Sequence, residues 1–178
     1  EMPMDVKWLP DKTGRFTERP HYEPAALDEE CERIVRRFLT TRHGSARYPI
    51  ATDDLTVLVE QHAGSLDPFA DLPTDIEGRT CFYRGGQKPD VAVNLRLQEG
   101  RFENRLRTTL THELGHVVLH TFIWEFAPAN DVREASCNRD RMIGIGSTDW
   151  MEWQAGYACG AFLMPKTAVA RLIGQPDG

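Results

Sequence analysis

Two features are scarce in this sequence, and each absence excludes a class of protein. No apolar run approaches the ~18 residues that a membrane-spanning helix needs. Positive charge is not in excess, since 21 Lys and Arg oppose 27 Asp and Glu for a net charge of −6. Nucleic-acid-binding domains are usually basic. We therefore expect neither membrane insertion nor direct nucleic-acid binding.

The sequence is also poor in cysteine patterns. Its four cysteines are widely spaced and form no C-x-x-C pair: Cys31, Cys81, Cys137 and Cys159. Such spacing favours reduced thiols over a disulfide framework or a structural zinc knot. The first sixteen residues lack the apolar core of a secretory signal. These features lead us to expect a cytoplasmic protein.

The 178 residues, 40% of them apolar, suit one domain with its own core. Proline, glycine and scattered charge in 1–23 predict an extended N-terminal arm. We expect the remaining residues, 24–178, to form a single domain. Apolar periodicity and end signals divide that domain. They predict an α+β fold with helices in 24–42, 51–64, 101–120, 150–163 and 166–173, antiparallel strands in 79–84 and 90–97, a loop over 65–78 and irregular structure over 121–148.

The helix expected over 101–120 contains His112-Glu113-Leu114-Gly115-His116, an H-E-x-x-H motif. Histidines four residues apart lie together on one helix face and can bind one metal ion, with the glutamate beside them as a general base. The motif alone is weak, because shuffling this composition would produce it in about one or two chains in a hundred. The alternative is a surface helix whose polar face happens to hold two histidines.

A zinc hydrolase centre needs a third protein ligand, and the sequence limits the choice. His120 lies roughly 12 Å along the helix from His112, too far to share one ion, so a helix-end or supporting role suits it better. No histidine follows His120, which excludes a three-histidine metzincin pattern. The remaining oxygen ligands are Glu125, Asp131, Glu134, Asp140, Asp149 and Glu152.

Glu152 is favoured among these six residues. It opens a helix whose same side carries small residues, so that helix can approach the motif helix closely at Gly115, where a glycine needs a packing reason. The alternative role for Glu152 is a capping box, with Asp149 as the N-cap and Glu152 three residues later. The small residues are Ala155, Gly156, Cys159 and Gly160.

Two segments, "VAVNLRLQEGRFENRLRTTLTHELGHVVLH" and "MEWQAGYACGAFLMP", together resemble the ImmA/IrrE family of metallo-endopeptidases. The chain departs from the family pattern at Thr111, Gly156 and Ala158. Its step from His116 to Glu152 is longer than usual, which predicts an insertion over 121–148. These departures affect substrate identity more than chemistry.

The resemblance implies a gluzincin-like zinc endopeptidase with ligands His112, His116 and Glu152 and the base Glu113. Mn²⁺ or Fe²⁺ can also occupy such ligands. Family members commonly cleave a helix-turn-helix transcriptional repressor, so we expect a protein substrate of that kind and a role in stress-related transcription. The competing interpretation is a docking module of the antitoxin or anti-repressor type that keeps the fold and acts by binding.

Two further expectations concern the substrate. An oxyanion donor is needed, and Tyr83, Tyr157, His120 and Arg105 are candidates, although packing or surface roles are commoner for each. The strand in 90–97 is expected to pair its edge with an extended peptide. Asn94 is either a peptide-placing residue or an ordinary turn residue at the strand end.

Overall fold

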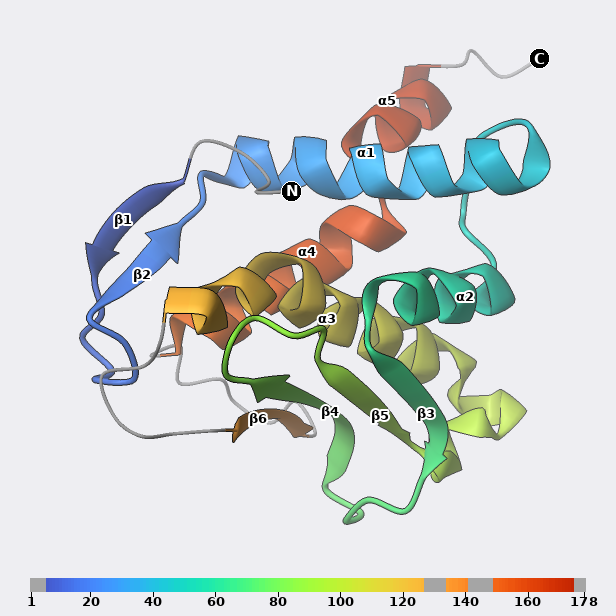
Figure 1. The fold of residues 1–178 in the computed structure, drawn as a ribbon. Helices are drawn as coiled ribbons and strands as arrows, with labels where there is room; N and C mark the ends of the chain where they lie inside the picture. The colour runs from blue at the N-terminus through green and yellow to red at the C-terminus, as the bar shows by residue number, and fades with distance from the viewer. Residues whose placement is uncertain (1–5, 127–133, 141–148, 175–178) are drawn as a thin grey trace.

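The computed structural model describes residues 6–126, 134–140 and 149–174 and shows a mixed helix and sheet fold, as the sequence predicts. Figure 1 shows a small sheet on one side of the central helix α3, with α4, α1 and α5 following on the other side. The helices are α1 (Pro24–His43), α2 (Thr52–His62), α3 (Glu103–His120), α4 (Trp150–Leu163) and α5 (Lys166–Gly174). Within the described residues, none of these helices combines the length and apolarity needed to cross a membrane.

The main sheet has four strands in the order β3-β5-β4-β6. As predicted, β4 and β5 are antiparallel neighbours, while β3 runs parallel to β5. The expected strand over 90–97 ends at Asn94, and a 3-10 helix, η1 (Leu95–Gln98), follows it. The strands are β3 (Ser65–Ala70), β4 (Ile76–Tyr83), β5 (Asp90–Asn94) and β6 (Glu134–Asp140).

Two segments that the sequence presented as irregular contain strands. Residues 65–78, expected to be a loop, hold β3 and the start of β4. Pro68 lies in β3, which tolerates it as an edge strand because one side of the strand makes no sheet hydrogen bonds. Within 121–148, a 3-10 helix η3 (Thr121–Phe126) continues α3, and β6 pairs antiparallel with β4. The rest of that stretch lies outside the described residues.

The segment expected as an extended arm is a hairpin that packs on the helices. Strands β1 (Lys7–Pro10) and β2 (Glu18–His21) pair antiparallel. The chain after β2 is anchored by Tyr22, which is buried and donates a hydrogen bond to the carbonyl of Leu119 at the end of α3. Strands of four residues carry too little periodicity for the sequence to reveal them.

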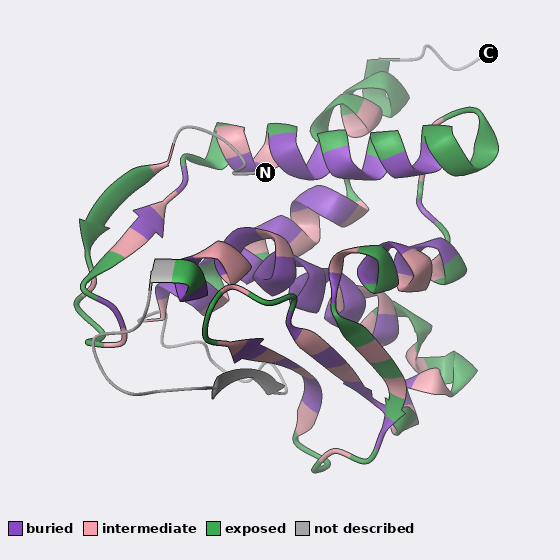
Figure 2. Cartoon of the chain, in the orientation of Figure 1, coloured by how far each residue is buried: buried purple, intermediate pink, exposed green. Residues whose placement is uncertain are grey.

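Helix α3 is buried on both of its faces. Leu110 and Leu114 face the apolar core. The opposite polar stripe is buried as well: the exposed fraction is 7% for His112, 0% for Glu113 and 1% for His116. The middle of the central helix is accordingly purple in Figure 2. The alternative of a surface helix with a polar face is therefore wrong. Such burial of polar side chains is unfavourable unless each finds a partner.

The polar stripe of α3 meets α4 at a close helix–helix contact. A Cβ atom added to Gly115 would lie 3.1 Å from the Cα and the carbonyl oxygen of Ala155 and 3.2 Å from the Cβ of Ala158. The predicted approach through small residues is thus confirmed for Ala155. It is not made by Gly156, which is exposed and has no neighbour within 4 Å of an added Cβ.

This contact predicts opposite effects for the same substitution at two glycines. Gly115→Leu should lower the free energy of unfolding by ~1–3 kcal/mol, because the side chain has no room against α4. Gly156→Leu should leave stability unchanged or raise it by up to ~1 kcal/mol, because leucine forms helices better than glycine. Urea denaturation of both variants measures the difference, and equal effects would contradict the close contact.

Candidate metal centre

Three side chains from two helices converge beside Gly115. His112 and His116 lie on successive turns of α3, and Glu152 lies in the first turn of α4. The Nε2 atom of His112 lies 2.9 Å from Glu152 Oε2, and the Nε2 atom of His116 lies 3.3 Å from Glu152 Oε1. These three residues form a group whose ligand atoms all lie within 4.8 Å of one another. The group could hold a metal ion.

The geometry of this group fits a small divalent cation. Ligand atoms ~2.0–2.2 Å from a tetrahedral ion lie about 3.3–3.6 Å from one another. The two imidazole–carboxylate separations, 2.9 and 3.3 Å, are near this range, and all ligand atoms lie within 4.8 Å of one another. The Glu152 side chain is 31% exposed, whereas the His116 side chain is 1% exposed. The group is therefore closed on the histidine side and open on the carboxylate side, where a fourth ligand can enter.

Electrostatics also suit a cation. Burial alone would raise the pKa of Glu152, but hydrogen bonds from His112 and His116 outweigh it and hold that pKa well below its usual range. Glu152 is therefore a carboxylate, so the group offers one negative charge together with two imidazole nitrogens. Zinc accepts this donor set, and manganese and iron accept it as well.

The structure also decides the capping question at the start of α4. Asp149 is the N-cap, as expected: its carboxylate accepts a hydrogen bond from the backbone N–H of Met151 and pairs with Arg15. Glu152 turns instead toward the histidines. Of the other oxygen candidates, Glu125 is exposed. Asp131 and the side chains of Glu134 and Asp140 lie outside the described part of the chain.

Glu113 is separated from solvent and held by the sheet. Its exposed fraction is 0%, and the hydroxyl of Thr80 on β4 donates to its Oε2 at 2.5 Å. A Cβ atom on Gly78 would lie 2.5 Å from Glu113 Oε1, so only glycine at this position leaves room for the carboxylate. No local sequence pattern distinguishes Thr80 and Gly78, because their role depends on which strand faces α3.

Behind His116, a row of hydrogen bonds leads away from the cluster. His116 Nδ1 lies 3.0 Å from His120 Nδ1, and His120 Nε2 lies 2.9 Å from Gln154 Oε1. Gln154 Nε2 in turn donates to the carbonyl of Pro20 at 2.9 Å. Burial, followed by the nearby His116 ring, lowers the pKa of His120 well below 6.5. His120 is therefore a neutral imidazole.

The candidate oxyanion donors are engaged elsewhere. Tyr83 donates to Asp90 and Tyr157 donates to Asp28. Arg105 pairs with Glu77, and His120 belongs to the row behind His116. The bonds of Tyr83, Tyr157 and Arg105 are directed away from the group of His112, His116 and Glu152, and His120 contacts His116 through the ring nitrogen opposite Glu152. The geometry therefore favours none of the four candidates as the donor.

The expected pairing of the strand in 90–97 with a substrate is wrong. β5 lies between β3 and β4, so both of its edges already carry sheet hydrogen bonds. Asn94 is a turn residue: its amide donates to the carbonyls of Leu72, Pro73 and Ile76, and its Oδ1 accepts from the N–H of Arg96. This network holds the end of β5 and leaves the Asn94 side chain no role toward a peptide.

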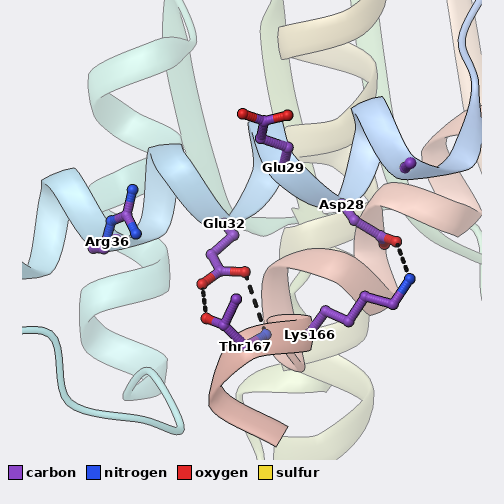
Figure 3. Close-up of a pocket in the computed structure, with 7 residues that line it drawn as sticks. Asp28, Glu29, Glu32, Arg36, Lys166 and Thr167 are labelled. Atoms are coloured by element: carbon purple, nitrogen blue, oxygen red, sulfur yellow. Dashed lines mark hydrogen bonds and ion pairs between the residues drawn. The ribbon is translucent and has the colours of Figure 1, made fainter. Parts of the chain in front are cut away.

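A separate cavity of about 330 Å³ lies between α1 and α5 (Figure 3). Its lining is charged, and two of its contacts join the helices: Lys166 pairs with Asp28, and Thr167 donates to Glu32. Figure 3 shows Glu32 and Asp28 directed toward α5, while Glu29 points away. None of the residues that line it belongs to the histidine cluster, so we interpret this region as the joint that holds α5.

In comparisons with known proteins, no family model and no curated protein matches the chain.

The cluster predicts metal binding by specific side chains. The chain purified without added metal should contain about one divalent ion, because two nitrogens and a carboxylate form a near-complete tetrahedral site. His112→Ala, His116→Ala and Glu152→Ala should each lose the ion. His62→Ala, at a histidine on α2 that contacts the carbonyl of Leu58, should retain it. Elemental analysis of the folded variants is the measurement, and a metal-free wild-type chain would contradict the assignment.

Proposed function

We propose that this chain is a metal-dependent endopeptidase with His112, His116 and Glu152 as ligands and Glu113 as the general base. The observation that carries the proposal is the convergence of three ligand side chains, one of which, His112, is followed in the chain by the fully buried Glu113. A protein that only docks a partner has no need for a carboxylate at Glu113. The resemblance of the two quoted segments to the ImmA/IrrE family points to the same chemistry.

In this proposal, His112, His116 and Glu152 bind the ion, and Glu113 transfers the proton. A divalent ion bound to the three ligands would polarise a peptide carbonyl and acidify a water molecule. Glu113 accepts the proton of the attacking water and then delivers it to the nitrogen of the leaving amine. Thr80 and Gly78 hold the Glu113 carboxylate in one position, so the base is oriented before the substrate arrives.

The substrate we propose is a protein, of which a helix-turn-helix transcriptional repressor is the best candidate. Family resemblance supports it, and so does charge. DNA-binding domains are basic, whereas this chain has a net charge of −6. Opposite net charges accelerate the encounter of two proteins. Cleavage of the repressor would relieve repression.

Glu113→Gln tests the enzyme against the docking alternative. The variant should lose ~10²–10⁴-fold in peptide cleavage, because glutamine cannot accept the proton. Metal content should be unchanged, since Glu113 is not a proposed ligand. The measurement is mass spectrometry of labelled N-termini in cells that express either form, followed by cleavage rates on the substrate so identified.

The docking alternative predicts a different result for the same pair of proteins. Wild type and Glu113→Gln would then produce the same cellular effect, and the wild type would generate no new N-termini. That outcome would overturn the peptidase proposal while leaving the metal centre in place.

Gly78→Ala tests how the base is positioned. The new methyl group would displace the Glu113 carboxylate and lower the cleavage rate by about 10²-fold, as expected for a catalytic group moved by about 1 Å. Zinc content should stay at the wild-type level. Gly100→Ala is the matched control, because an added Cβ meets nothing within 4 Å there. Equal cleavage rates in the two variants would show that Gly78 does not position the base.

A further inference from the structure

The hydrogen bonds behind His116 have a direction that the structure determines. A proline carbonyl has no hydrogen and can only accept, so the side-chain atom of Gln154 that faces Pro20 must be the NH₂ group. The other amide atom is then the oxygen, and it faces His120. The orientation of the Gln154 amide therefore follows from its backbone partner.

The same reasoning continues from Gln154 to His116. The amide oxygen of Gln154 accepts, so Nε2 of His120 carries its proton. A neutral imidazole has one donor and one acceptor, so Nδ1 of His120 accepts. Nδ1 of His116 must then donate to it, across 3.0 Å. With Nδ1 engaged in this bond, Nε2, which contacts Glu152 in this structure, is the atom of His116 that would bind an ion.

We propose that His120 and Gln154 are positioning residues that hold His116 in the tautomer able to bind the metal ion through Nε2. Ligating histidines usually donate their second ring N–H to such a partner, which fixes the ring and strengthens the ligand. Here the partner is a second histidine, and the chain of bonds ends on the backbone of the β1–β2 hairpin. The hairpin thus acts on the metal centre through Pro20.

Burial argues that this row has a role beyond filling space. The exposed fraction is 0% for His120 and 1% for Gln154. Buried amides and imidazoles cost free energy unless they are hydrogen-bonded, and apolar side chains of similar volume would fill the space between α3, α4 and the hairpin more cheaply. The row contains a donor and an acceptor at every junction, which is what fixing a tautomer requires.

Gln154→Leu and Gln154→Glu test whether Gln154 orients the His116 ring or only packs in the interior. Leucine removes the acceptor for His120, so the affinity for zinc should fall by about 10–100-fold. Glutamate still accepts from His120 but cannot donate to Pro20, so it should keep near wild-type affinity even if the fold is less stable. Zinc affinity is measured by competition with a chromogenic chelator, and thermal unfolding of each metal-free variant gives its stability.

Gln98 provides a matched control elsewhere in the fold. Its Nε2 donates to the carbonyl of Pro68 at 2.8 Å, so Gln98→Leu removes the same kind of hydrogen bond away from the cluster. This variant should lose stability but bind zinc as the wild type does. If the zinc affinity of all three variants simply follows their stability, the row is structural and the proposal is overturned.

The positioning role depends on the metal centre and not on peptidase activity. The experiment distinguishes failure of the positioning role from failure of the metal centre. Wild-type affinity in Gln154→Leu would overturn the positioning role alone. No zinc binding by the wild-type chain would overturn the metal centre together with it. A second readout is the tautomer of His116 in the zinc-loaded wild type, since ¹⁵N NMR should show the proton on Nδ1 shared with His120.

Discussion

The candidate site depends on one steric constraint, the close approach of α3 to α4. A carboxylate on one helix can reach two imidazoles on another only when the backbones come near, and Gly115 against Ala155 allows this. A larger residue at either position would separate the helices and take Glu152 away from His112 and His116. The glycine is unfavourable for helix formation in isolation. Its presence in the middle of α3 reflects the geometry of the cluster rather than the stability of the helix.

The second constraint is that every polar group brought into the interior by this contact needs a partner. Partners for the polar stripe of α3 come from two elements, β4 and α4. The sheet supplies Thr80 to Glu113, α4 supplies Glu152 to the two ligand histidines, and Gln154 supplies an acceptor to His120. Because these partners come from β4 and α4, and Gln154 is itself bonded to the β1–β2 hairpin, the arrangement of these elements is linked to the orientation of the side chains.

The sequence predicts features that depend on residues near one another in the chain, and it does not predict contacts between distant segments. Helix periodicity, end signals and the i, i+4 spacing of His112 and His116 are local, and the sequence revealed them. The small residues flanking Glu152 also pointed correctly to a close helix contact. The strands in 65–70 and 134–140, the hairpin and the partners of Glu113 could not be found in this way. Thr80 and Gln154 become recognisable only once the sheet and α4 are placed against α3, since no local pattern distinguishes them from other polar residues.

The two faces of the polar stripe are supported by different parts of the fold, and this separates the two chemical roles. The proposed base is held by β4 on one side. The proposed ligand His116 is held through His120 and Gln154 by α4 and the hairpin on the other. A substitution in β4 can therefore alter proton transfer without altering metal affinity, and a change in the hairpin can do the reverse. A hydrolase gains from such separation, because the position of the base and the affinity for the ion can each change without loss of the other.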